Sequence, residues 1–337
     1  MKKIGSGTFG ISSEVNFLEY CAVVGQKEKE GPLGKWFTHF SEDEYFGQKT
    51  FERAETQMQK EAMDSVNKKS GFTEKDIDFI FAGDLLNQCV SSNYCVRDHS
   101  MQFFGVYGAC STMAETIILS AMAIDGGFAE RCIAITSSHF CSAERQFRFP
   151  LEYGSQRPPS SQWTVTAAGC VLLGKTAVAG DYPKVDKICP GRVIDMGVCD
   201  INDMGSAMAA SAVDTFTRFF EDTNTKPEDY DLILTGDLGK IGHAVVTEIM
   251  LKNGYNMQKN YDDCGKLIFD AEKQDVHAGG SGCGCSAAVL TGYLLPEMQK
   301  KTYKNVLFAA TGALMSPIVN QQNESIPGIT HLVNIKI

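Results

Sequence analysis

The sequence has no long apolar run. Its hydrophobic stretches are interrupted by glycine, charged or polar residues and do not approach the ~18 residues of a membrane-spanning helix. The opening residues, MKKIGSGTFGISSEV, also lack the apolar region of a secretory signal peptide. We therefore expect cytoplasmic synthesis and no membrane-spanning segment.

Clusters of lysine and arginine are missing as well. The formal net charge of the 337 residues is −10, and no basic stripe interrupts this acidic balance. Because non-specific binding to nucleic acid depends on such clusters, we expect no nucleic-acid partner.

Cysteine, by contrast, is abundant. The chain has 12 cysteines, but disulfide frameworks are typical of short exported chains. Most of the cysteines, such as Cys132 in RCIAITS and Cys170 in TAAGCVLLG, stand in apolar, strand-like runs. We therefore expect reduced cysteines that pack as small hydrophobic side chains.

Two parts of the chain resemble each other. DIDFIFAGDLL (76–86) matches DYDLILTGDLG (229–239), and each follows a helix-like segment. Further along, four residues recur at a constant offset: Cys110, Ser111, Leu119 and Thr136 against Cys285, Ser286, Leu294 and Thr311. Because strands alternate with helices in both copies, we predict an α/β fold of two duplicated halves related by pseudo-twofold symmetry.

The halves meet at a short boundary. The turn-rich stretch 180–195 is too short to be a flexible linker. We predict a single unit over residues 1–337, with an N-terminal half at 1–179 and a C-terminal half at 180–337. Residues 146–163, which contain Pro, Gly, Ser and Arg, are interpreted as an excursion over a surface or a pocket mouth.

One cysteine stands where a nucleophile could act. In GACST, Cys110 lies between a small-residue turn and the predicted start of a helix. The positive end of a helix lowers the pKa of a thiol and makes it a better nucleophile. Cys110 is therefore either a catalytic nucleophile or a cysteine left in a nucleophile's position.

The duplicated unit with a cysteine at this turn resembles the thiolase superfamily, which includes thiolases and β-ketoacyl synthases. GACST resembles the nucleophile turn, WTVTAAGCVLLG (163–174) the GDGAGAVVL strand, and GSGCGCSAAVL (280–290) the GHTLGAAG loop. The resemblance covers nearly the whole chain and implies the layered αβαβα thiolase-like fold. It also implies a homodimer, because members commonly pair through the sheets of the first half.

A narrower resemblance is to a family of thiolase-like sporulation proteins from spore-forming Firmicutes. It rests on GTFGISSE (7–14), EDEYFGQKTFERAETQMQ (42–59) and the long segment 137–166. It implies binding of dipicolinic acid (pyridine-2,6-dicarboxylate), uptake of this molecule into the developing spore, and membrane channel proteins as partners. Because no lipidation signal or basic amphipathic helix occurs, we expect peripheral attachment to the spore inner membrane through those partners.

Condensing enzymes of the superfamily need two residues besides the thiol, usually His/His or His/Asn. The matching positions here contain Gly236 or Asp237, and Cys283. An oxyanion donor is worth roughly 3–4 kcal/mol in the transition state, and an acidic side chain would oppose the developing charge. We therefore expect a non-catalytic binding protein, with an acyltransferase that uses Cys110 as the alternative. His243 and His277 lie nearby in the sequence and could in principle take the role of these residues, but His243 would need a rearranged loop to reach the position.

The helix starts near Cys110 and Cys285 favour carboxylate binding through free backbone N–H groups. The candidate ligand-binding residues are Cys110, Ser111, Asp84, His139, Asp237, His243 and Cys283. Asp84 and Asp237 could instead cap turns or helices, and His139 could be structural. Arg145 and Arg148 are further candidates for contact with a carboxylate.

No resident metal or cofactor is expected. The CGC sequence (283–285) with His277 upstream lacks the paired knuckles of a structural zinc site. Calcium would arrive only with the ligand, as a chelate that acidic oxygens could contact. A structural subunit without any ligand is a third interpretation.

Overall fold

The computed structural model describes residues 1–147, 157–175 and 180–337. Its main strands form two sets of five. The first set, in spatial order, is β3 (Asn16–Gly25), β9 (Ala167–Gly174), β7 (Arg131–Ser138), β5 (Phe79–Gly83) and β6 (Gln102–Gly105). The second is β10 (Lys184–Cys189), β15 (Gly328–Lys336), β14 (Asn305–Ala313), β11 (Leu232–Thr235) and β12 (Tyr261–Asp263).

The two sets share one topology. In each, the first three strands pair antiparallel and the last two add in parallel, and the chain visits the five positions in the same sequence. The predicted duplication within an α/β fold is therefore confirmed. A pair between Lys184 and Asn16 joins β10 to β3 and links the sets edge to edge.

The predicted turn-rich stretch 180–195 contains β10, the first strand of the second set. Val185 and Ile188 of this strand are buried, and a bulge between Val185 and Lys187 interrupts its pairing with β15. Because this stretch contains several lysines and aspartates, its sequence does not resemble that of a buried strand. Three short strands, β1 (Lys2–Ile4), β2 (Thr8–Gly10) and β4 (His39–Ser41), extend the joined sheet.

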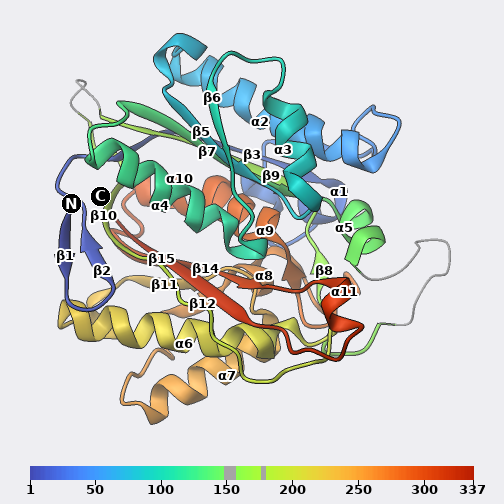
Figure 1. The fold of residues 1–337 in the computed structure, drawn as a ribbon, viewed down its shortest axis with the longest axis vertical. Coiled ribbons are helices and arrows are strands. Elements are labelled where there is room, and N and C mark those ends of the chain that lie inside the picture. Colours follow the sequence, from blue (N-terminus) through green and yellow to red (C-terminus); the bar gives the residue numbers. More distant parts are fainter. Residues whose placement is uncertain (148–156, 176–179) are drawn as a thin grey trace.

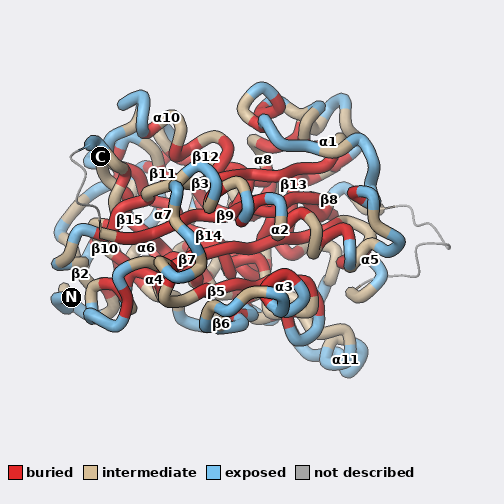
Figure 2. Tube along the Cα trace, turned by 90° about the horizontal axis from the view of Figure 1, so that it is seen from above, coloured by how far each residue is buried: buried red, intermediate tan, exposed pale blue. Residues whose placement is uncertain are grey.

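Helices lie in three layers around the strands, as Figure 1 shows. On one outer face, α2 (Phe51–Ser70) packs on β3, β9 and β7; on the other, α6 (Met204–Thr223) packs on β14 and β15, with α7 (Gly239–Lys252) against it. Between the strand sets, α4 (Thr112–Asp125) contacts β7 and β14, and α9 (Cys283–Ala288) contacts β9. The order is the predicted αβαβα, with the buried core in the middle (Figure 2).

The remaining elements are shorter. They are α1 (Gln26–Lys29), α3 (Val90–Val96), α5 (Phe140–Phe147), α8 (Cys264–Ile268), α10 (Leu295–Gln299), α11 (Pro317–Asn320), β8 (Trp163–Thr164) and β13 (Gly280–Ser281). A 3-10 turn, η4 (Ala109–Ser111), leads into α4, and a π-helical segment, η7 (Val289–Leu294), connects α9 to α10.

Gly169 in β9 lets α9 approach the strand closely. A Cβ atom there would lie 2.7 Å from backbone atoms of Ala287, where no side chain fits. Gly169 also begins a G-x-x-x-x-G-K-T pattern that ends at Thr176. A phosphate-binding loop of this pattern connects a strand to a helix. Because Gly169 and Gly174 both lie within β9, the spacing here serves packing.

The cysteines are free thiols, and most of them are buried. Cys132 and Cys170 have no exposed surface, which confirms the expectation of reduced core cysteines. Cys199 departs from this pattern and is exposed. Among the helices that the structure describes, none is long and apolar enough to cross a membrane.

Candidate functional site

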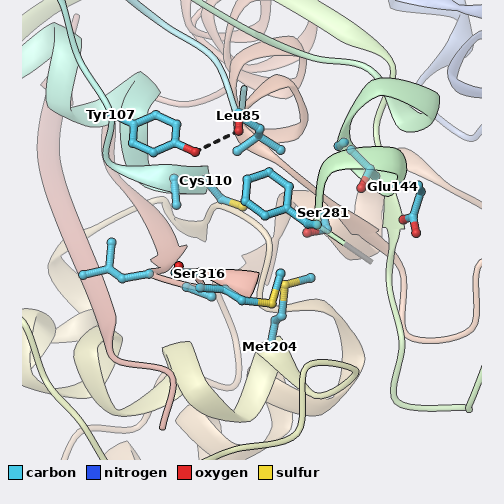
Figure 3. A pocket seen from close by; sticks show the side chains of 14 residues that line it. Leu85, Tyr107, Cys110, Glu144, Met204, Ser281 and Ser316 are labelled. Atoms are coloured by element: carbon cyan, nitrogen blue, oxygen red, sulfur yellow. Dashed lines mark hydrogen bonds between the residues drawn. The ribbon is translucent and has the colours of Figure 1, made fainter. Parts of the chain in front are cut away.

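A cavity of about 280 Å³ lies beside Cys110. Its walls come from separate parts of the chain: Cys110 of η4, Glu144 and Phe147 of α5, Met204 at the start of α6, and residues 314–316 after β14 (Figure 3). Both halves of the chain therefore contribute to it.

The turn before α4 directs Cys110 toward this cavity. Ala109 has φ 51°, a left-handed conformation that costs an alanine on the order of 1 kcal/mol. Two side chains hold the turn: the hydroxyl of Ser111 donates to the Gly108 carbonyl (2.6 Å), and that of Thr112 to the Ala109 carbonyl (2.6 Å). Ser111, a predicted ligand residue, is fully buried and supports the turn without lining the cavity.

The Cys110 thiol lies beside the carboxyl group of Asp237. Burial raises the pKa of this thiol well above its usual value, and the adjacent Asp237 charge raises it further. The sequence predicted a lowered pKa from the helix start, and this prediction is wrong. Desolvation and the neighbouring carboxylate outweigh the helix, so the thiol is protonated at neutral pH.

Asp237 follows β11 and connects three elements. Its Oδ2 accepts from the Gly282 N–H at the start of α9 (2.8 Å), and its Oδ1 accepts from the Thr311 hydroxyl of β14 (2.9 Å). Burial raises the pKa of this carboxyl to about 6. Asp237 lies behind Cys110 and Ser281 and does not itself line the cavity. These hydrogen bonds agree with the alternative prediction, that Asp237 caps a turn or a helix.

Asp84, the counterpart of Asp237 in the first half, also binds backbone N–H groups. Its Oδ1 accepts from Leu86 N–H and its Oδ2 from Ser92 N–H, both at 2.9 Å, which caps α3. The Cys283 thiol donates to the Ser137 carbonyl (2.8 Å) and is fully buried. Neither Asp84 nor Cys283 is among the residues that line the cavity.

The candidate histidines lie away from the cavity. The Cys141 N–H donates to Nδ1 of His139 (3.1 Å), so the proton is on Nε2, which donates to the Glu44 carbonyl (2.8 Å). Burial lowers the pKa of His139 and of His243, whose ring stacks on Tyr261 at 4.4 Å. No histidine, His243 and His277 included, is found among the described cavity-lining residues.

The predicted arginine contacts are not found at the cavity. Arg145 forms an ion pair with Glu52 of α2 on the outer face. Arg148 lies outside the described residues, as does half of the predicted excursion at 146–163. Phe147, within that segment, lines the cavity, and so does Thr164, the first residue after it.

Several lining residues were not predicted from the sequence. Glu144 and Phe147 share one face of α5, Tyr107 precedes η4 and donates its hydroxyl to the Leu85 carbonyl (2.9 Å), and Ser281 belongs to β13. The i, i+3 spacing of Glu144 and Phe147 on α5 was the one local signal in the sequence that could have indicated these lining residues. Among the described lining residues there is no lysine or arginine, and the other walls are mainly apolar.

This arrangement of two duplicated strand sets, with a cysteine turn between them, is the thiolase-like fold of condensing enzymes. A crystal structure of 3-oxoacyl-[acyl-carrier-protein] synthase III from Aquifex aeolicus VF5 matches 95% of this chain and 99% of its own (TM-score 0.55, 12% identity). A crystal structure of cerulenin-bound OleA from Xanthomonas campestris matches 96% of this chain and 97% of its own (TM-score 0.60, 10% identity). These likenesses define the fold.

Sequence similarity gives a narrower class. The family model described as Stage V sporulation protein AD (SpoVAD) matches residues 5–336. The chain is 43% identical over 331 residues to Stage V sporulation protein AD of Bacillus subtilis (strain 168), covering 98% of this chain and 97% of that protein. The chain therefore belongs to the SpoVAD family, and the resemblance drawn from its sequence is confirmed.

Proposed function

We propose that this sporulation protein binds dipicolinic acid in the Cys110 cavity and supports its uptake into the developing spore. The observation that carries the proposal is the cavity itself: it is bordered by Leu85, Phe147 and Met204 on apolar sides and by Ser281 and Ser316 as hydrogen-bonding groups. A flat pyridine ring with two carboxylates needs this combination of an apolar slot and a few polar contacts.

Charge favours the calcium chelate as the bound form. The cavity has the Glu144 carboxyl group in its wall and, among its described residues, no cationic side chain. Free dipicolinate is a dianion, and burying its two negative charges in a mainly apolar cavity would be costly. Calcium bound by the ligand neutralises that charge, and Ca²⁺ accepts carboxylate oxygens such as those of Glu144.

Isothermal titration calorimetry tests this proposal. Calcium dipicolinate should bind the full chain with measurable heat, and dipicolinate with a calcium chelator should bind at least tenfold more weakly. Glu144→Gln should reduce the preference for the chelate. Glu248→Gln, on the exposed side of α7 and outside the cavity, is the matched control. A flat titration with both forms of the ligand contradicts the proposal.

The alternative is an acyltransferase with Cys110 as the acyl carrier. Its support is that Cys110 lines the cavity at the turn where condensing enzymes of the superfamily hold their nucleophile. Against it stands the raised pKa of the thiol beside Asp237. Intact mass spectrometry after incubation with acyl-CoA decides: an adduct on Cys110 favours the acyltransferase.

The partners we propose are a second copy of the chain and membrane channel proteins of the same sporulation system. Support for the homodimer comes from β6, which lies at one edge of the sheet, with Phe104 and the nearby Tyr107 both exposed. An unpaired strand edge with exposed aromatic side chains is suited to pairing with another strand. We propose peripheral attachment to the spore inner membrane through the channel proteins, which pelleting of the purified protein with liposomes would contradict.

A further inference from the structure

A second surface of interest lies next to the cavity, around α11. The segments 193–203 and 314–327 are far apart in the sequence but are joined by hydrogen bonds. Ile194 and Gly328 form a bridge, the Ile326 N–H donates to the Val198 carbonyl (2.8 Å), and the Ser325 hydroxyl donates to Asp195 (2.6 Å). We call these two segments together the α11 surface.

The α11 surface exposes large apolar side chains. Ile318 is 71% exposed and Val319 42% on α11, and Met196 is 69% and Val193 58% exposed on the adjoining segment. In Figure 2, α11 stands at an outer corner of the molecule. Single exposed apolar residues need no explanation, but several on one surface mark an interaction site.

The same surface is acidic. Its two segments contain Asp195, Asp200, Asp203 and Glu324, and no lysine, arginine or histidine. A hydrogen bond from Ser325 lowers the pKa of Asp195, so this carboxylate is charged at neutral pH. Such a surface repels anionic lipid headgroups and a second copy of its own acidic face, and it attracts basic side chains.

The α11 surface is continuous with the ligand cavity. A groove of about 310 Å³ between Asp195, Val319 and Ile326 shares Leu314, Met315 and Ser316 with the wall of the Cys110 cavity. A segment bound in this groove would therefore touch residues that also face the ligand.

We propose that the α11 surface docks a basic amphipathic segment of a partner protein beside the cavity. The apolar side chains of that segment cover Ile318, Val319 and Met196, and its lysines or arginines face Asp195, Asp200 and Glu324. That this partner delivers or receives the ligand rests on the proposed function; the docking itself does not.

Fluorescence anisotropy with the full chain tests the docking. The probe is a labelled amphipathic helix of leucine and lysine about four turns long, with a lysine–serine peptide of equal charge for comparison. The leucine–lysine peptide should bind more tightly. The double variant Ile318→Ser/Val319→Ser should weaken its binding at least tenfold, and Glu324→Lys several-fold at low salt. Phe128→Ser is the matched control, since Phe128 is 78% exposed just beyond the C-terminal end of α4 and should change binding less than twofold.

Several results would overturn the docking proposal. The first two are no binding of the leucine–lysine peptide, and a weakening of peptide binding by Phe128→Ser that equals the weakening by the α11 variant. The third is a mass of the protein in solution that falls when the α11 residues are substituted. The fourth is binding to phosphatidylglycerol vesicles that these substitutions abolish. The last two would assign the surface to a second copy or to a membrane. Calorimetry with calcium dipicolinate on the same variants separates the two proposals: wild-type chain that binds the peptide but not the ligand refutes the proposed function alone.

Discussion

The Cys110 thiol lies beside Asp237, a carboxyl group that is fixed by Gly282 and Thr311 and whose charge raises the pKa of the thiol. A nucleophilic thiol needs a neighbouring base that stabilises its thiolate form. Here the neighbour carries negative charge and is held in place by three hydrogen bonds, from Ser281, Gly282 and Thr311. The turn keeps the geometry of a nucleophile while its surroundings favour the protonated thiol.

Replacing this neighbour should activate the cysteine. Asp237→Asn removes the charge that raises the pKa of Cys110, so the rate of alkylation by iodoacetamide at neutral pH should increase several-fold. Mass spectrometry of the labelled peptides measures the rate. Cys283, which is fully buried, should stay unlabelled if the fold is intact, and an unchanged rate at Cys110 would show that Asp237 does not control the thiol.

Glu28 should make stability depend on pH. It is buried on α1, where its Oε1 accepts from Thr166 N–H (2.9 Å), and burial raises its pKa from 4.5 to about 8. Because the folded-state pKa lies above the unfolded one, its stabilising contribution is complete below about pH 4.5 and is lost as the pH rises through about 8. Glu28→Gln should flatten the fall in the free energy of unfolding between about pH 5 and pH 8, measured with urea. The exposed Glu30→Gln should leave the slope as in wild type.

Asp222 should show the opposite dependence. Its carboxylate accepts from the N–H groups of Ser6 (2.6 Å), Gly7 (2.8 Å) and Thr8 (2.8 Å), which lowers its pKa to about 2 although burial opposes this. The stabilisation of the fold by the ionised Asp222 is present above the unfolded pKa of 3.8 and is lost as the pH falls through about 2.

Asp222→Asn should therefore reduce the free energy of unfolding at pH 7 by about 1–2 kcal/mol, a range that allows for solvent screening. Urea denaturation measures the difference, with the neighbouring exposed Glu221→Gln as the control. A loss of the same size in both variants would mean that the turn at residues 6–8 does not depend on Asp222.

The edge strand β6 should carry the homodimer. Phe104 stacks on Phe81 (5.2 Å between ring centroids) and is still 51% exposed, so a partner strand would cover it. Phe104→Glu places a charge at that contact and should convert dimer to monomer in light scattering after size-exclusion chromatography. Ile318→Glu, on the α11 surface, is the control and should leave the mass unchanged. A wild-type chain that is monomeric at every concentration would contradict the dimer.

The sequence was sufficient for the fold because its signal repeats. Asp84 and Asp237 end equivalent strands, and the offset between Cys110 and Cys285 reproduces the matched turns. The cavity was harder to predict from the sequence, because Glu144, Met204 and Ser316 meet there from segments distant in the chain. Sequence position alone also cannot tell a carboxyl group that faces a ligand from one that caps backbone N–H groups, which is how Asp84 and Asp237 are used.

The duplication has a consequence for stoichiometry. Cys285 is the counterpart of Cys110, yet it has no exposed surface, and its thiol lies 3.6 Å from the Gly236 carbonyl. Among the residues that the structure describes, the turn at Cys110 lines the cavity and the turn at Cys285 does not. A ligand held at the Cys110 turn would therefore find no equivalent place at the Cys285 turn, although the internal duplication relates the two turns.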